Sequence, residues 1–372
     1  MKMICLLKSE NLKLPYDNNS LGIISLLSEK YDNYLKELND FYSTVLSSDI
    51  ARIIDDVKMT TDGIIDTLQK YLLGDIIGAG ITFNDIMGKN QDSIMKVSKY
   101  YGQYTFHTYY RALLKSKKGK TFNNKKEYLH IPFELRHLVS NQRYSVSGFP
   151  CMYLGATPYT CYEELGRPDQ NIMSFVKVEI PKEYNLITIG LLPYELKNRL
   201  YKQKDIDNVD IISAYLKMLP IIMSCSVKVD IEKKGAAFKE EYIIPQLITQ
   251  WLIKSGREFD GILYFSNATL THSRINYRLY QNVVLPVKKI ERSGYCKKLS
   301  KEIKLTSPIH ISRSRIKLFK EYKYKCFQNK DGFNELPGNG RINSGKSEIH
   351  YSASGFRLLE CKLSKLECSA IG

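Results

Sequence analysis

The stretch from residue 130 to residue 168 constrains the fold of this chain more than any other. It reads HIPFELRHLVSNQRYSVSGFPCMYLGATPYTCYEELGRP. Gly148 is a natural turn, and strand-prone residues flank it on both sides, QRYSV before and CMYLG after. Arg143 lies five residues before Gly148 and Tyr153 five residues after it. If the two arms pair as an antiparallel hairpin, Arg143 and Tyr153 lie opposite each other on one face of the sheet.

A helix is expected directly after this hairpin. Thr157 supplies an N-cap side chain and Pro158 occupies the first helical position, where a missing N–H costs nothing. Glu164 lies two turns into that helix, so its side chain can reach back over the sheet. Its neighbour Glu163 is about 100° further round the helix, so only one of the two carboxylates can face the same site. A guanidinium, a phenol and a carboxylate from one short segment form a candidate active site.

These residues resemble the RES domain, a family named for arginine, glutamate and serine residues. Its members are bacterial enzymes that degrade NAD, many of them toxins of toxin–antitoxin pairs. The matching features are an RY dipeptide, a glycine, a proline, an LYL-like strand and a glutamate on a helix. In this chain they are Arg143-Tyr144, Gly148, Pro150, Met152-Tyr153-Leu154 and Glu164.

Three further blocks extend the resemblance over residues 105 to 300. YYRAL at 109 to 113 is similar to the family's opening strand and contains Arg111. DGILYFS at 260 to 266 is similar to the strand that ends on the family's serine, here Ser266, and YQNVVLP at 280 to 286 is similar to the closing strand. One departure is Ser145, which stands where the family usually has asparagine after the arginine dipeptide.

The resemblance implies an α+β fold with an ADP-ribosyltransferase-like split β-sheet core. The helical N-terminal domain expected before it lies outside the resemblance and follows from the helical spacing of apolar residues. The resemblance also implies catalytic roles for three residues. Glu164 would stabilise positive charge on the ribose, Arg143 would bind the pyrophosphate, and Tyr153 would stack on the nicotinamide or donate its hydroxyl. Substrate contacts would come from Arg111, Ser266 and Tyr144. Each of these residues also has a plain structural interpretation, as a solvent-facing carboxylate, a surface arginine, a core tyrosine or a strand-end serine.

Three regions are expected along the 372 residues. Residues 1 to 100 show apolar residues at helical spacing and predict a helical module, with Gly78 and Gly80 as helix stops. Residues 101 to 300 form the RES-like catalytic domain. Residues 301 to 372 form a basic C-terminal extension, expected to be loosely ordered beyond about residue 325.

The formal charge of +16 is unevenly distributed. Residues 1 to 100 carry a net −3, residues 101 to 300 carry +12, and residues 301 to 372 carry +7. A positive field around the candidate site would attract an anionic dinucleotide or a nucleic acid. A compositional bias toward lysine, isoleucine, asparagine and tyrosine explains the charge equally well.

Other bulk features narrow the class of protein. No apolar run approaches the ~20 residues that cross a bilayer, so we expect no membrane span and a cytoplasmic location. The eight cysteines form no CxxC pair and the six histidines are dispersed, which argues against a zinc site. No metal or organic cofactor is expected, and NAD would be the substrate.

The sequence therefore predicts an NAD glycohydrolase or NAD phosphorylase that cleaves the nicotinamide N-glycosidic bond and acts as a growth-arresting toxin or defence effector. An ADP-ribosyltransferase that modifies a protein or nucleic acid is an alternative enzyme. A basic nucleic-acid-binding protein is the alternative from another class. A small helix-turn-helix (Xre-like) antitoxin is an expected partner, and a homo-oligomer is a further expectation.

Overall fold

The structure is a computed structural model. It describes residues 2–18, 22–102, 107–116, 119, 121–233, 235–254, 258–267, 280–322, 341–343 and 348–371. The chain divides into two compact units with interleaved segments. Unit 1 comprises Met1–Thr105, Ser140–Phe149 and Asn185–Asn267, and unit 2 comprises Phe106–Val139, Pro150–Tyr184 and Ala268–Gly372. The first division at Thr105 lies close to the boundary expected near residue 100.

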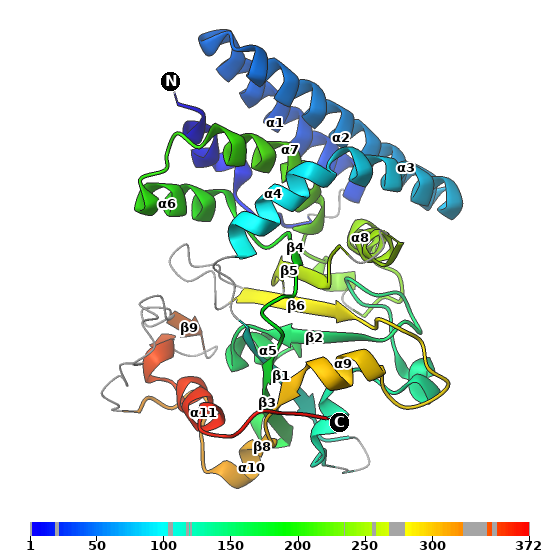
Figure 1. Cartoon of the computed structure of the whole chain (residues 1–372), viewed down its shortest axis with the longest axis vertical. Helices are drawn as coiled ribbons and strands as arrows, with labels where there is room; N and C mark the ends of the chain where they lie inside the picture. The colour runs from blue at the N-terminus through cyan, green and yellow to red at the C-terminus, as the bar shows by residue number, and fades with distance from the viewer. Residues whose placement is uncertain are drawn as a thin grey trace. The chain divides into compact units, whose positions relative to one another are not determined.

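Unit 1 is predominantly helical (Figure 1). Its helices are α1 (Ile23–Val45), α2 (Ser48–Leu72), α3 (Ile76–Lys89), α4 (Gln91–Gly102), α6 (Pro193–Gln203), α7 (Val209–Cys225) and α8 (Ile243–Lys254). Two strands, β4 (Leu186–Thr188) and β5 (Gly261–Phe265), pair in parallel. Short 3-10 helices are η1 (Met3–Lys8), η2 (Glu10–Leu12), η6 (Ile231–Lys233) and η7 (Glu240–Tyr242).

The residues expected to be helical at the N-terminus contain α1 to α4, which belong to the same unit as residues 140 to 149 and 185 to 267. Each of these helices buries one apolar stripe; Leu27 and Leu38 of α1 and Ile64 of α2, for example, are completely buried. The two expected helix stops are wrong, because Gly78 and Gly80 both lie inside α3. The turn comes earlier, at Gly74, whose φ of +91° suits glycine.

Helix α7 packs against α1, α2, α4 and α8 and contains Pro220. A proline has no N–H, so the carbonyl oxygen of Leu216, four residues earlier, loses its donor within the helix. The hydroxyl of Tyr34 in α1 donates to that oxygen at 2.9 Å. The sequence thus places a buried tyrosine where the proline leaves an acceptor open, which ties α1 to α7.

Unit 2 is built on an antiparallel sheet in the order β11-β7-β3-β1-β2-β6, with β8 paired to β3. The strands are β1 (Thr108–Leu114), β2 (Cys151–Gly155), β3 (Met173–Glu179), β6 (Gln281–Pro286), β7 (Lys304–Leu305), β8 (Ile309–His310) and β11 (Ser369–Ala370). A separate hairpin joins β9 (Arg341–Asn343) and β10 (Glu348–His350).

The helices of unit 2 are short. They are α5 (Pro158–Glu164), α9 (Lys297–Glu302), α10 (Ile311–Ser314) and α11 (Gly355–Ser364), with 3-10 turns η3 (Lys125–Tyr128), η4 (Phe133–Leu138), η5 (Gln170–Ile172) and η9 (Tyr351–Ala353). Helices and a largely antiparallel sheet together make this an α+β protein, which confirms the expected fold class.

The expected hairpin around Gly148 is wrong. All of residues 140 to 155 are described, and those before Gly148 form a tight turn closed by a bridge between Gln142 and Ser145. Strand β2 pairs along its whole length with β6 and at one position with β1. Gly148 adopts a positive φ of +79°, so the predicted turn is confirmed, while the predicted partner of the strand is wrong.

The expected loose C-terminal extension is also wrong for the described residues from 348 to 371. Strand β11 pairs with β7, which pairs with β3 in the central sheet. Helix α11 packs on α5 and β3, and its Phe356 is completely buried. The expectation rested on a glycine- and asparagine-rich stretch, residues 334 to 347. Of that stretch, the structure describes only residues 341 to 343.

Candidate functional site

The helix that carries the two glutamates begins where the sequence predicts. The Thr157 hydroxyl accepts a hydrogen bond from the backbone N–H of Thr160 at 3.0 Å, and Pro158 occupies the first turn of α5. The helix lies directly on β2, because a Cβ atom at Gly155 would come within 2.9 Å of the Cys161 sulfur. Glycine is needed at this position for the helix to approach the strand so closely.

The two neighbouring glutamates have different environments, as their helical offset predicts. Glu163 is 3% exposed, and its Oε1 lies 3.1 Å from Nε of Arg167. Burial raises the pKa of Glu163, and the ion pair with Arg167 opposes that rise. Glu164 is exposed, and its Oε1 accepts a hydrogen bond of 2.6 Å from Nδ2 of Asn282. Glu164 is therefore the solvent-exposed carboxylate of the two, and Asn282 orients one of its oxygens.

The register of β2 and β6 places Tyr153 near this carboxylate. Gly155 is opposite Asn282 and Tyr153 is opposite Val284. Because alternate residues of a strand share a face, Tyr153 leaves β2 on the same face as Gly155, the face that α5 covers. Tyr153 is only half-buried. The phenol and the carboxylate predicted from the sequence thus belong to one side of the unit 2 sheet.

Arg111 on β1 is a cation in a poorly solvated position. Burial lowers the pKa of its guanidinium to about 10, while the Cys161 thiol and the hydroxyls of Tyr153 and Tyr295 favour its charged form. Its Nη1 atom is buried and has no hydrogen-bond partner among the described residues. In that same part of the chain, no carboxylate pairs with Arg111. Arg111 is half-buried, and a guanidinium with one buried nitrogen lacking a described partner favours an anionic ligand.

The Cys161 thiol interacts electrostatically with both Arg111 and Glu164. Burial raises the pKa of this thiol to about 12; the charge of Arg111 lowers it, and that of Glu164 raises it. Its sulfur donates to the carbonyl oxygen of Tyr110 at 3.3 Å. Cys161 is therefore an inert, neutral thiol, as expected for a buried cysteine, and it lies within the electric field of both charged groups.

His130 beside Arg111 has a structural role. Its Nδ1 lies 2.7 Å from the carbonyl oxygen of Ile131, and its Nε2 accepts from the backbone N–H of Cys296 at 2.8 Å. This pairing requires a neutral ring that donates from Nδ1. Burial lowers the pKa of His130 to about 4, and the nearby charge of Arg111 contributes to the lowering. Both contacts are therefore structural.

Arg143 and Tyr144 belong to unit 1. The Arg143 guanidinium lies 5.0 Å from the centroid of the Tyr242 ring, and its Nη1 makes two long hydrogen bonds, of 3.4 and 3.5 Å, to the carbonyl oxygens of Cys225 and Glu241. Tyr144 is buried, and its ring lies 4.5 Å from that of Tyr264. Tyr144 is thus a core aromatic of unit 1, while Arg143 keeps part of its donor fork unoccupied.

Ser266 follows β5 directly and is completely buried in unit 1. The six residues singled out in the sequence therefore fall into two groups. Arg111, Tyr153 and Glu164 lie in unit 2, and the others, Arg143, Tyr144 and Ser266, lie in unit 1. Within unit 2, Arg111 interacts electrostatically with Tyr153, and Cys161 with both Arg111 and Glu164.

Asn282 is the residue that the sequence interpretation missed. It lies in the closing strand, where an amide interrupts the apolar residues of YQNVVLP, and it is 3% exposed. A polar side chain in so apolar a strand is a signal of a required hydrogen bond, since buried amides without partners are costly. The polar residue in an apolar strand is visible in the sequence itself.

Within the described part of the chain, no three His, Cys, Asp or Glu side chains converge as a metal site requires. The same residues include no helix with the length and apolar character needed to cross a bilayer.

Comparison with known proteins gives one informative similarity. No protein-family model matches the chain, and no solved structure matches it. The chain is 28% identical over 303 residues to a protein of Bacillus subtilis (strain 168) named “Putative toxin YopC”. The alignment covers 77% of this chain and 65% of that protein, so the chain matches slightly less than two thirds of the relative's length. This chain is therefore similar to a protein that carries the name of a toxin.

Proposed function

We propose that this protein degrades NAD by cleaving the bond between nicotinamide and ribose, and that it arrests growth as a toxin. Two lines of support meet here. Arg111, Tyr153 and Glu164 of the RES-like segment all belong to unit 2, and the relative in Bacillus subtilis carries the name of a toxin.

The chemistry assigns a separate role to each group in unit 2. As the bond to nicotinamide breaks, its electron pair leaves with the neutral base and positive charge builds on the ribose. The Glu164 carboxylate, oriented by Asn282, stabilises that charge. Water or inorganic phosphate then attacks the ribose carbon. Arg111 binds the pyrophosphate, and Tyr153 packs against the nicotinamide ring.

One observation carries the proposal above the others: the buried Nη1 of Arg111 has no partner among the described residues. A guanidinium held in this way has lost much of its hydration and gains most from a doubly negative ligand. A pyrophosphate meets that requirement with paired oxygen acceptors. The carboxylate that the reaction needs lies in the same unit, on α5.

The direct experiment incubates purified protein with NAD and follows free nicotinamide. Release with water alone indicates a glycohydrolase, and release that requires inorganic phosphate indicates a phosphorylase. Glu164→Gln should lower the rate by at least about a hundredfold, because the neutral amide cannot stabilise the developing cation. Glu367→Gln is the matched control, since that carboxylate is exposed in the same unit and lies outside the proposed site. Undiminished release by Glu164→Gln would refute the assignment.

A second function is favoured by one further observation. Unit 2 contains 32 Lys and Arg against 15 Asp and Glu, whereas unit 1 contains 23 against 24. Such a concentration of positive charge suits a polyanion, either as a bound nucleic acid or as the acceptor of ADP-ribose. Radiolabel from NAD on a nucleic acid or a protein would identify a transferase. Salt-sensitive retention of DNA or RNA without turnover would identify a binding protein.

A further inference from the structure

The junction of α2 and α3 in unit 1 presents a cluster of exposed aliphatic side chains. Leu73 is 86% exposed, Ile77 is 79% exposed and Ile81 is 66% exposed. Leu72 is 40% exposed and Ile76 is 56% exposed. We call these five residues the α2–α3 tip. Single exposed leucines or isoleucines are common on protein surfaces, but five within ten consecutive residues form a patch that marks an interaction site.

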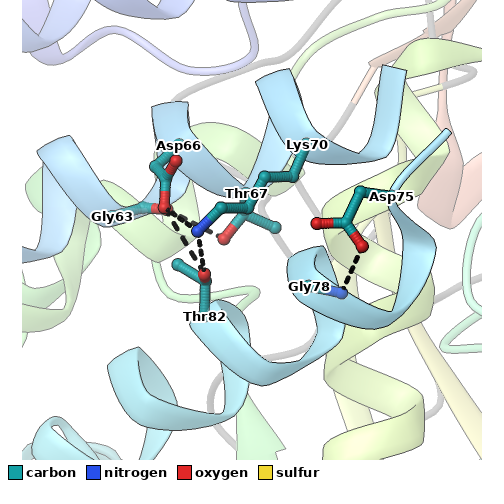
Figure 2. Close-up of polar contacts among 7 residues, drawn as sticks. All are labelled: Gly63, Asp66, Thr67, Lys70, Asp75, Gly78 and Thr82. Carbon is teal, nitrogen blue, oxygen red and sulfur yellow. Dashed lines mark hydrogen bonds and ion pairs between the residues drawn. The ribbon is translucent and has the colours of Figure 1, made fainter. Parts of the chain in front are cut away.

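The tip is held in a defined shape by polar contacts on the adjoining turns (Figure 2). Nζ of Lys70 in α2 donates to Oδ2 of Asp66 at 2.6 Å and to the hydroxyl of Thr82 in α3 at 2.9 Å. Asp75 caps α3 by accepting from the backbone N–H of Gly78 at 2.8 Å. The apolar side chains therefore project from a preorganised helical hairpin, so binding would require little ordering of the backbone.

Residues 48 to 89 of the hairpin carry seven Asp against four Lys and Arg, a net −3, and three of these cations pair within the hairpin. Lys58 pairs with Asp62 at 3.0 Å, Lys70 with Asp66 at 2.6 Å, and Lys89 with Asp85 at 2.8 Å. Asp75 remains as the one carboxylate at the tip, and its side chain caps the helix. The excess acidic residues Asp49, Asp55 and Asp56 lie in the first turns of α2, at the end away from the tip, so the apolar side chains of the tip can meet an identical surface without strong repulsion. An anionic membrane is a poorer match, because the first 100 residues carry a net −3.

The exposed area fits a protein partner of the same kind. From the exposed fractions, the five residues present on the order of 600 Å² to solvent, most of the ~800 Å² that each partner contributes to a standard stable interface. The surface beside Gly80 is open, since a Cβ atom there would meet nothing within 4 Å. A large aliphatic side chain from a facing helix can therefore approach the α3 backbone closely between Ile77 and Ile81.

We propose that the α2–α3 tip is the contact surface of a homodimer of this chain. In a two-fold dimer the same patch serves both partners, so one mutation alters both sides of the interface. The inference concerns unit 1 only and does not depend on the proposed reaction in unit 2.

Sedimentation velocity of the full chain over about 1 to 100 μM tests the proposal, since standard interfaces associate in this range or below it. The wild-type protein should sediment as a dimer. Ile77→Glu with Ile81→Glu should raise the dissociation constant at least about a hundredfold and give a monomer, because carboxylates would replace apolar contacts. Both positions are exposed, so the variant should stay folded. Its circular dichroism spectrum should match that of the wild type, and its thermal unfolding should remain cooperative.

The matched control is Val209→Glu with Ile253→Glu, which alters two other exposed aliphatic residues of unit 1. It should remain dimeric. A wild-type monomer at 100 μM would overturn the proposal, and so would a dimer that survives the Ile77 and Ile81 substitutions. Flotation of a monomeric wild-type protein with lipid vesicles, lost in the tip variant, would instead identify the patch as a lipid contact and also overturn it.

Discussion

At the residue scale, two adjacent glutamates of α5 have different environments, one buried and one exposed. Glu163 is buried and paired with Arg167, so it holds α5 in place. Glu164 is exposed, and its carboxylate accepts a hydrogen bond from Asn282. The difference follows from helical geometry, because neighbours in a helix point about 100° apart. Conservation is not needed to distinguish them.

Asn282→Ala tests whether Glu164 must be oriented. Without the amide, the carboxylate loses its 2.6 Å hydrogen bond and samples several rotamers. We expect kcat for nicotinamide release to fall by about tenfold to a hundredfold, with KM nearly unchanged, because the contact acts on the charge of the transition state. Asn282→Asp should reduce kcat further, since it places a second carboxylate beside the first. If every Asn282 variant that loses kcat also loses thermal stability, in the same order across the variants, the role of Asn282 is purely structural.

Glu195 in unit 1 provides a prediction about pH. This residue is 2% exposed, and its Oε1 accepts from the hydroxyl of Tyr101 at 2.6 Å and from Nη2 of Arg199 at 3.2 Å. Burial raises its pKa to about 7, although Arg199 and Tyr101 favour the charged form. An unfolded glutamate has a pKa of about 4.3. The native state therefore holds its proton more tightly, and stability falls as the pH rises from about 4.5 to about 7.

The loss of stability from Glu195 over that interval should be about 3 kcal/mol, and Glu195→Gln should remove it because an amide does not titrate. Urea unfolding at several pH values, followed by the fluorescence of Trp251 in unit 1, measures the slope. The comparison uses the slope and not the absolute stability, since the amide also changes the contact with Arg199. A variant with the same pH slope as the wild type would contradict this assignment.

At the element scale, the sequence was most informative where a pattern is local. The N-cap Thr157, the start of α5 at Pro158 and the amphipathic helices α1 and α2 needed only neighbouring residues. Strands β5 and β6 lie in the two blocks that the resemblance identifies as strands. The pairing of β2 could not be read in this way, because alternation fixes which face is buried but does not choose the partner strand. Strand β6 begins 130 residues after β2 begins.

Helix α11 is the element whose role the sequence understated. Its weak flanking pattern suggested a loose tail, yet Phe356 packs edge-on against Tyr159 at 5.3 Å and Phe319 at 5.2 Å. Tyr162 of α5 completes this aromatic cluster at 5.6 Å from Phe356. The contacts come from residues far apart in sequence, so no local rule could reveal them. They make α11 the support on which α5, and therefore Glu164, rests.

Phe356→Ala should destabilise unit 2 by about 3 to 5 kcal/mol, because it removes a fully buried ring from an aromatic cluster. Phe356→Leu should cost less, since it keeps most of the volume. Thermal unfolding and protease sensitivity around α5 measure the effect. Phe238→Ala is the control, because that ring is 50% exposed in unit 1. If both alanine variants melt alike, α11 does not support α5 as inferred.

At the scale of the whole molecule, the two units should respond to acid in opposite ways. Glu195 makes unit 1 more stable as the pH falls toward 5. His130 acts in the other direction in unit 2: burial lowers its pKa to about 4, below its ordinary value of about 6.5. The unfolded state therefore binds the extra proton, and the contribution of His130 is complete above pH 6.5 and is lost as the pH falls toward 4.

Hydrogen exchange of the full chain at pH 5 and pH 7, expressed as protection factors that remove the pH dependence of the intrinsic rate, separates these responses. Protection of α4, α6 and α7 in unit 1 should be higher at pH 5, and protection of β1 and β3 in unit 2 should be lower. Glu195→Gln should abolish the first change only, and His130→Gln the second only. Because each titrating group lies in the core of one unit, selective effects of this kind require that the units open separately. Equal changes in both units, whichever residue is altered, would show that the chain unfolds as one cooperative body.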